Sequence, residues 1–388
     1  MNFEATEIQS QLSDLAKKFV RNEIFPVVEN DEHEEKFRPE LIQKLGDLGL
    51  TGIPVSEDLE GAGLGYQEYA RVIEELAVGS AAYAVSVAVT GLPQAILSKY
   101  GTEAQKKKYI PRLASGKAIG AFSLSEAGAG SDAGSLRTSA VLHRSPSGDY
   151  YVVNGTKLWT TQADIAETII LMARTGGPGP KGVSAFILEK GMPGLKMGKR
   201  EKKMGMGISH TMEVVLENVK IPIENRISDE GDGFKVAMVA LDSGRITIAS
   251  TAVGVARGAL EVALSHAKTR EQFGKPISEF QGVSFMLADM ATLLDCSRML
   301  VQRAAWLKDN GKPFSTEAAM AKVFATDAAM KITTDAVQIL GGSGYTQEFP
   351  VERYMREAKV LQIVEGTNQI QRHVIGRNLV SPRTGSNS

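Results

Sequence analysis

Residues 145–161 read SPSGDYYVVNGTKLWTT, and this stretch decides the fold class. The turn formers Ser145–Gly148 precede a β-rich run that begins at Tyr150. Three further β-rich runs follow, at residues 168–173, 183–188 and 212–216. No helix-length segment separates these runs, so we expect an antiparallel sheet rather than alternating β-α-β units.

Helical patterns flank this β region on both sides. Thr6 with Gln9 and Thr102 with Gln105 have the spacing of capping boxes at helix starts. Long helical patterns rich in small residues resume beyond residue 230. The sequence therefore predicts an α+β multidomain fold. Its domains are an N-terminal α-helical domain (1–117), a central antiparallel β domain (118–228) and a C-terminal, four-helix-bundle-like α domain (229–388).

Composition excludes several classes of protein. The 388 residues are 43% hydrophobic and 23% charged, as in globular proteins, and the formal net charge is -1. No basic excess exists for binding a nucleic-acid backbone. The single cysteine, Cys296, excludes an internal disulfide framework, and we expect it in a helix core. The five histidines have no metal-ligand spacing, so no metal site is predicted.

The N-terminus, MNFEATEIQSQL, shows neither a basic nor an apolar targeting region, and we expect a cytoplasmic, bacterial-type protein. The 23 residues from Leu76 to Ser98 carry no charge and are long enough to cross a bilayer. They are mostly Ala, Gly, Ser and Val, however, and are interrupted by Pro93 and Gln94. This composition favours a buried helix over a membrane span.

Two segments suggest ligand binding but have simpler explanations. Gly61–Gly65 resembles a dinucleotide loop, yet it follows an acidic segment instead of a buried strand. A glycine-rich turn is the better interpretation. Asp31–Glu35 is acidic, but a solvated loop is a better interpretation than a metal site.

Three further segments could form a site, and the residues alone leave each one open. The small residues and hydroxyls of 122–132 could approach a polar ring or phosphate, or form a plain turn. Trp159 could pack on a planar cofactor or in a core. Glu365, flanked by apolar residues, could be a base with a raised pKa or a surface residue near a helix start.

Taken together, the motifs of this chain resemble the acyl-CoA dehydrogenase family of flavoproteins over essentially the whole length. The motifs that carry the resemblance recur in order: Ser125–Asp132 (SEAGAGSD), Trp159–Thr161 (WTT), Arg270–Pro276 (REQFGKP), Gln338–Tyr345 (QILGGSGY) and Glu365–Thr367 (EGT). One departure is Ala127, where the family usually has proline. The resemblance implies an FAD cofactor, a homotetramer, and electron transfer to an electron-transfer flavoprotein.

The resemblance also implies roles for individual residues. Glu365 matches the catalytic base of the short- and medium-chain members. Residues that match FAD-binding positions are Phe122, Leu124, Ser125, Gly130, Ser131, Trp159, Thr160, Thr161, Arg270, Phe273, Phe280, Gln281, Gln338, Ile339, Leu340, Gly341, Gly342, Thr367, Asn368 and Gln369. Those from Arg270 to Gly342 would reach the FAD of a neighbouring subunit. Residues that match positions holding the CoA thioester are Ser131, Asp242, Ser243, Gly244, Arg245 and Gly366.

The implied reaction is the α,β-dehydrogenation of an acyl-CoA to a 2-enoyl-CoA, as in fatty acid β-oxidation and lipid metabolism. No cation lies between Ala84 and Leu97, a stretch that lines the acyl pocket in relatives, which argues against a dicarboxylate tail. Chain length, branching and cyclic substrates stay open. A flavin oxidase or monooxygenase on the same fold is the alternative enzyme. A non-catalytic acyl-CoA-binding scaffold is a third possibility, but both Glu365 and the FAD loop are present.

Overall fold

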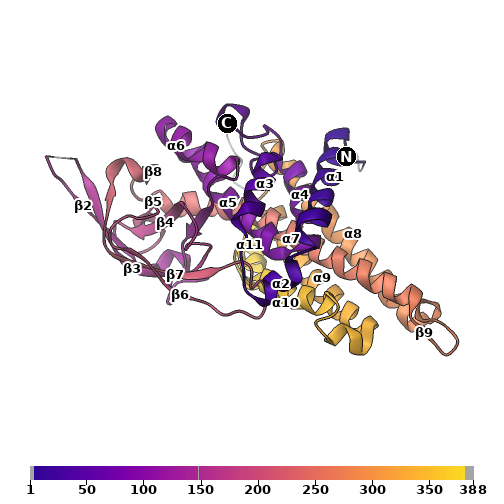
Figure 1. The fold of residues 1–388 in the computed structure, drawn as a ribbon. Coiled ribbons are helices and arrows are strands. Elements are labelled where there is room, and N and C mark those ends of the chain that lie inside the picture. The colour runs from indigo at the N-terminus through magenta and orange to yellow at the C-terminus, as the bar shows by residue number, and fades with distance from the viewer. Residues whose placement is uncertain (1–3, 147, 381–388) are drawn as a thin grey trace.

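The computed structural model describes residues 4–146 and 148–380, and it places a β-sheet region beside two groups of helices (Figure 1). The chain begins with the N-terminal helices: α1 (Glu7–Phe19), α2 (Val28–His33), α3 (Pro39–Asp47), α4 (Tyr66–Gly79), α5 (Ala81–Tyr100) and α6 (Glu103–Ala114). Both predicted capping boxes are present, at the starts of α1 and α6. Sequence reasoning therefore located these two helix starts correctly.

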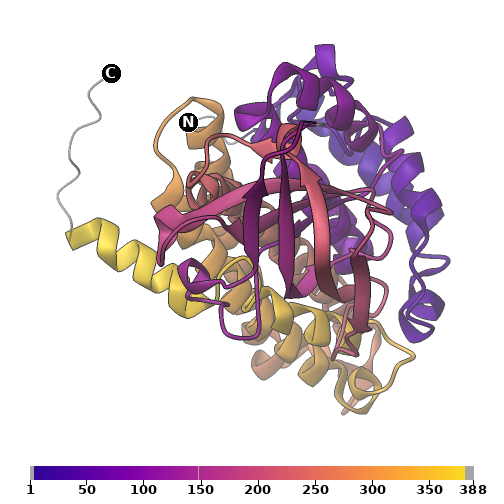
Figure 2. The ribbon, with the colours of Figure 1, turned by 90° about the vertical axis from the view of Figure 1, so that its left-hand side faces the viewer.

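The chain then enters the sheet. Its strands are β1 (Gly120–Ser123), β2 (Ser139–His143), β3 (Tyr150–Thr161), β4 (Thr168–Arg174), β5 (Val183–Glu189), β6 (Leu195–Arg200), β7 (Thr211–Pro222) and β8 (Arg226–Ile227). In the described residues they form one eight-stranded sheet in the order β6-β7-β3-β2-β4-β5-β8, with β1 paired to β4. Figure 2 views the sheet in front of the helices.

The expectation of a purely antiparallel sheet needs one correction, because the sheet is mixed. Most neighbours are antiparallel, but β1 and β2 both pair with β4 in parallel. The two strands of the β2–β3 hairpin run in opposite directions and lie between β1 and β4 in sequence. After β3, the chain reverses once more, so β4 runs in the same direction as β1 and β2. The three-part order of helices, sheet and helices is confirmed, whereas the exact domain boundaries at 117/118 and 228/229 stay a prediction.

The C-terminal helices are long. They are α7 (Gly233–Thr269), α8 (Gln281–Asp309), α9 (Ser315–Leu340), α10 (Val351–Leu361) and α11 (Asn368–Val380). The short strands β9 (Glu271–Gln272) and β10 (Lys275–Pro276) form a hairpin between α7 and α8. This hairpin lies at the far tip of the helical region, away from the sheet (Figure 1).

Two helices, α5 and α7, are long and apolar enough by composition to cross a membrane. Within their most apolar windows, 83% of α5 and 78% of α7 are buried in the protein. The two helices pack against each other and against α4, so their apolar surface faces other helices. The uncharged stretch that begins at Leu76 is thus core, as its Ala- and Ser-rich composition predicted.

Two smaller expectations fail. Cys296 is exposed on α8, because this long helix turns its buried side chains toward the neighbouring helices and leaves the cysteine on its outer face. The acidic segment is not a solvated loop: Asp31 lies on α2, is fully buried and pairs with Arg38. The Gly61–Gly65 segment is a turn with no strand before it, as interpreted, and Gly63 has a φ of +65°.

Candidate active site

A cavity of about 1410 Å³ opens where the three parts of the chain meet. Val89 and Leu92 of α5 contribute one wall, and helix α7 contributes another through Leu241 and Arg245. The loop after β1, the end of β3 and the segment between α10 and α11 also line the cavity, as do the loops at 176–180 and 203–205. The volume exceeds that of ordinary small-molecule pockets, which leaves room for a large cofactor and a substrate together.

Glu365 lies in the turn between α10 and α11 and lines this cavity. Its carboxyl oxygen Oε2 is buried and has no hydrogen-bond partner among the described residues. Burial raises the pKa of Glu365 to about 7, although Arg245 and Lys322 oppose the shift. A carboxyl group with a pKa near neutrality and a free oxygen is suited to take a proton from a bound molecule.

The backbone around Glu365 is unusual. Glu365 has a φ of +54° and Gly366 a φ of +88°, so two consecutive residues are left-handed. Gln371 holds this turn, because its Nε2 donates to the carbonyl oxygens of Glu365 (3.0 Å) and Gly366 (2.9 Å). Within residues 4–146 and 148–380, no acceptor takes the backbone N–H of Glu365. That N–H is therefore available to a ligand beside the carboxyl group.

Gly244 on α7 makes room for the carboxyl group. A Cβ atom built at this glycine would lie 2.7 Å from Glu365 Oε2. Real Cβ contacts are longer, so any larger residue at position 244 would push the carboxyl group away. The role of Gly244 in holding a thioester stays a prediction. In the structure, its backbone lies next to the carboxyl group of Glu365.

Trp159 owes its position to a β-bulge. The pairing of β3 with β7 shifts between Lys157 and Thr160, and Trp159 has a φ of +62°. Bulges of this kind redirect a side chain and are frequent beside active sites. Trp159 remains 58% exposed and lines the cavity, so its indole presents a flat apolar surface there. The alternative of a core tryptophan is wrong.

A buried lysine of β3 forms an ion pair that stabilises the loop after β1. Lys157 is fully buried, and its Nζ donates to Leu124 O (2.9 Å) and Glu126 Oε1 (2.8 Å). Glu126 also accepts from the backbone of Arg137 and Thr138. Sequence reasoning quoted Lys157 but gave it no role. A lysine inside a β-rich run was the signal that could have identified it.

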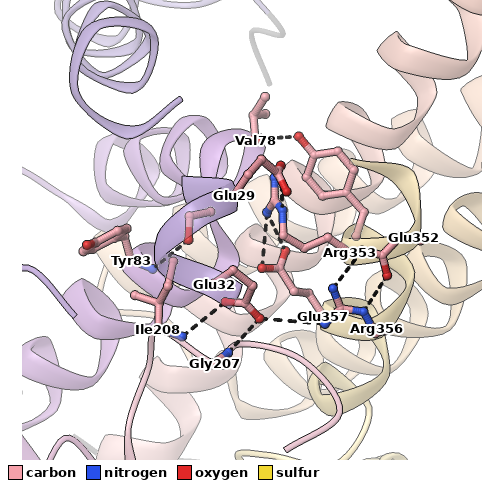
Figure 3. A network of polar contacts seen from close by, with 12 residues as sticks. Glu29, Glu32, Val78, Tyr83, Gly207, Ile208, Glu352, Arg353, Arg356 and Glu357 are labelled. Atoms are coloured by element: carbon pink, nitrogen blue, oxygen red, sulfur yellow. Dashed lines mark hydrogen bonds and ion pairs between the residues drawn. The ribbon is translucent and has the colours of Figure 1, made fainter. Parts of the chain in front are cut away.

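Residues 203–205 also line the cavity. Figure 3 shows a polar network that connects Gly207 and Ile208, just after this segment, with α2 and α10. Arg356 on α10 donates to Met204 O at 2.9 Å. Glu32 on α2 accepts from the backbone N–H groups of Gly207 (2.7 Å) and Ile208 (3.2 Å). In the same network, Arg353 pairs with Glu357, and both are buried. Burial raises the pKa of Glu357 to about 7, which Arg353 opposes.

The structure brings many of the sequence-predicted residues to this one cavity. The predicted residues that line it are Phe122, Leu124, Ser125, Gly130, Ser131, Trp159, Thr161, Arg245, Glu365, Gly366 and Thr367. They come from segments that are more than 200 residues apart in sequence. Their convergence is the main structural argument for a site.

The other predicted residues lie outside the cavity lining. Thr160 is buried and bonds Ser123 Oγ at 2.9 Å, which ties β3 to β1 behind the site. Asp242 and Ser243 lie on another face of α7, where Ser243 accepts from Lys308. Asn368 is buried in contact with α9, and Gln369 is exposed.

The residues predicted to serve a neighbouring subunit form a separate group. Arg270, Phe273, Phe280 and Gln281 belong to the β9–β10 hairpin or the start of α8, and Gln338 to Gly342 close α9. Within this chain none of them lines the cavity of Glu365. Phe273 is 94% exposed, and such an apolar side chain at a tip is typical of a residue that another chain covers.

Comparison with known proteins gives a consistent result. The chain matches three family models in succession: the N-terminal (residues 6–117), middle (121–219) and C-terminal (231–380) domains of acyl-CoA dehydrogenase. It is 43% identical to the short-chain specific acyl-CoA dehydrogenase of Clostridium acetobutylicum, covering 97% of this chain and 98% of the relative.

Two solved structures are also similar. The butyryl-CoA dehydrogenase of Megasphaera elsdenii has a TM-score of 0.96 and 43% identity, covering 98% of this chain and 100% of the other. A chain in a structure described as the electron transferring flavoprotein of Acidaminococcus fermentans has a TM-score of 0.95 and 45% identity, with the same coverage.

Proposed function

The chain belongs to the acyl-CoA dehydrogenase family, and from this premise we propose that it dehydrogenates acyl-CoA thioesters to 2-enoyl-CoAs. The observation that carries the proposal is Glu365, a carboxyl group with a free buried oxygen at the wall of a large cavity. It is an oxidoreductase of the flavoprotein type. Because relatives of this length and similarity are short-chain and butyryl enzymes, we propose a short, uncharged acyl chain as its substrate.

We propose FAD as the flavin, and the residues present fit it. Trp159 offers an exposed aromatic face, and no atom lies within 4 Å of where a Cβ would sit at Gly130. Both border the same cavity, so a planar ring could approach the backbone closely there. Bound FAD would supply the acceptor for the hydride that leaves the β-carbon.

The chain's own residues would then act on the α-carbon. The Glu365 carboxylate accepts the α-proton at an oxygen, while its free N–H donates to the thioester carbonyl and stabilises the negative charge that develops there. Carboxylate and N–H belong to one residue, so a single turn sets both the position of the base and that of the donor.

The acyl chain would lie against α5. Val89 and Leu92 are the α5 residues that border the cavity, and both are apolar. A carboxylate tail in contact with them would lose its hydration without gaining a partner. This supports the expectation of an uncharged acyl group, while branching and ring-containing chains remain for experiment to separate.

We also propose a homotetramer and an electron-transfer flavoprotein as the electron acceptor. Phe273 is exposed, and the β9–β10 hairpin lies at the tip of the helical region with none of its residues in the lining of this chain's cavity; both observations support a role toward another subunit. The similarity to a chain in a structure described as an electron transferring flavoprotein supports the partner.

One experiment tests the proposed function. The purified flavoprotein is mixed anaerobically with a panel of short-, medium- and long-chain acyl-CoAs that have a β-carbon, with straight, branched and cyclic members. We expect bleaching of the flavin band with butyryl-CoA and its near homologues, and a 2-enoyl-CoA product by mass spectrometry. The absence of bleaching with every member would refute the proposal. Rapid reoxidation by oxygen, faster than by electron-transfer flavoprotein, would support the alternative flavin oxidase.

A further inference from the structure

A buried lysine lies directly behind the turn that carries Glu365. Lys322 on α9 has no exposed surface. Its Nζ donates to Gly366 O at 2.9 Å and to Asn368 Oδ1 at 2.8 Å. Lysine is rarely buried without a purpose, because removing its charge from water costs several kcal/mol. The two acceptors stand on either side of Thr367 and thus span the turn.

The turn needs support of this kind. Left-handed conformation in a residue other than glycine costs on the order of 1–3 kcal/mol and persists only where neighbours enforce it. Lys322 and Gln371 both donate to Gly366 O, from opposite elements, and so fix the orientation of the peptide after Glu365. Asn368 passes the restraint on, because its Nδ2 donates to Thr326 Oγ1 and Asp327 Oδ1.

Lys322 also acts on the charge of the site. Burial lowers the pKa of Lys322 to about 7, and Glu365 opposes that shift. The charged groups around the pair are Arg245 from α7, which opposes protonation of Lys322, and Asp327 from α9, which favours it. A cation at Lys322 stabilises the ionised form of Glu365, which is the form that can accept a proton.

We propose that Lys322 is a positioning residue for the base: its ammonium group holds the Glu365–Asn368 turn and supplies positive charge that favours the Glu365 carboxylate. The inference rests on the proposed function, since it assigns Lys322 a part in the proton transfer to Glu365. It does not place Lys322 in contact with substrate. Lys322 acts on Glu365 through the hydrogen bond to the Gly366 carbonyl and through its positive charge.

The test compares Lys322→Met with wild type. Gly366 O keeps a second donor in Gln371 Nε2, and Asn368 keeps the bonds that its Nδ2 donates to Thr326 and Asp327, so the fold should survive the change. Lys331→Met is the matched control, because Lys331 is a half-exposed lysine on the same helix. Lys322→Gln is the second variant, since it retains a donor but removes the charge.

We expect the limiting rate of flavin reduction in Lys322→Met to fall about 10- to 100-fold, with the dissociation constant of the acyl-CoA changed by no more than about threefold. The acid limb of the rate profile should move up by on the order of one pH unit. Lys322→Gln should recover part of the rate and keep the same pH shift. Lys331→Met should match wild type in both.

An infrared readout separates this inference from the proposed function. The carboxyl stretch of Glu365, assigned by difference against Glu365→Gln, is titrated in wild type and Lys322→Met without substrate. A higher midpoint in Lys322→Met supports the inference even if no acyl-CoA reduces the flavin. An unchanged midpoint, or a rate within twofold of wild type, overturns it. A loss of rate that only parallels loss of flavin and melting temperature also overturns it, because a merely structural role predicts that result.

Discussion

The pH dependence of flavin reduction is the sharpest consequence of the burial of Glu365. Burial raises the pKa of this group to about 7, from an ordinary value of 4.5. A base acts only when ionised, so the reaction should follow the ionised fraction of Glu365. With a pKa of about 7, that fraction is roughly 10% at pH 6 and roughly 90% at pH 8. The rate should therefore rise about tenfold over these two pH units.

The assay is anaerobic stopped-flow bleaching of the flavin by a short acyl-CoA between pH 5.5 and 9, at the same ionic strength throughout. The quantity compared is the limiting rate of flavin reduction divided by the dissociation constant of the acyl-CoA. Glu365→Gln provides the reference. It is nearly isosteric and cannot accept the proton, so its rate should be lower by at least about 10²–10⁴ and should lose the acid limb. Its flavin content and acyl-CoA affinity should stay near wild type.

Two results would refute the reasoning. A midpoint near 4.5 would mean that Glu365 is well solvated in the working enzyme, contrary to its buried and unpartnered Oε2. A Glu365→Gln variant that reduces flavin at close to the wild-type rate would place the base elsewhere, most plainly on α7 near Leu241 to Arg245. The substrate class would then shift toward the branched or long-chain members of the family.

Four other predictions follow from the structure. Gly244→Ala should slow flavin reduction with flavin content retained, because the new Cβ meets Glu365 Oε2. Gly376→Ala, on the exposed side of α11 with open space around it, is the control and should not slow it; equal rates for the two variants would show that the carboxyl group moves freely. Lys157→Met should lower the free energy of unfolding by roughly 3 kcal/mol, because it leaves the largely buried Glu126 carboxylate without its cation and with backbone donors alone; urea titration measures this, and a change below about 1 kcal/mol would contradict the role of the pair. Burial tends to raise the pKa of Glu126, but hydrogen bonds from Lys157 and Thr138 lower this pKa to about 2. The stability that the carboxylate contributes should therefore be complete above pH 4.5 and be lost as the pH falls toward 2. A Glu126→Gln variant should not show this acid-dependent loss. Phe273→Ala or Arg270→Glu should weaken flavin retention and subunit assembly together, by absorbance and light scattering; a stable monomer with full flavin would disprove the proposed role toward a neighbour.

Sequence alone was sufficient where local chemistry decides the outcome. Thr6 and Thr102 begin helices because their hydroxyls accept backbone N–H bonds three residues on, and this pattern is visible in the sequence. It was insufficient where distant segments decide. Asp31 looked solvated because its partner Arg38 and the packing around α2 are not encoded in its neighbours. Likewise, Trp159 could be read as core or site, since the bulge that exposes it depends on pairing with β7.

The candidate site divides in the same way. Resemblance to a family was enough to nominate Glu365, Gly130 and Thr367, which the structure places on one cavity. The supporting residues escaped notice because they touch no ligand. Lys157 and Lys322 each donate a hydrogen bond to a backbone carbonyl of a loop that lies far away in sequence. Only the three-dimensional contacts connect these lysines to the site.

The apolar helix α5 has a consequence for the synthesis of the chain. Its principal cover, α7, begins about 130 residues after α5 ends, and ribosomes add roughly 5–20 residues per second. For about 7–26 s, the nascent chain therefore presents a helix that is apolar on every side while its partner helix is not yet made. Chaperone capture during translation should be strongest in this interval. Chains truncated before Gly233 should aggregate even though the whole sheet has been synthesised.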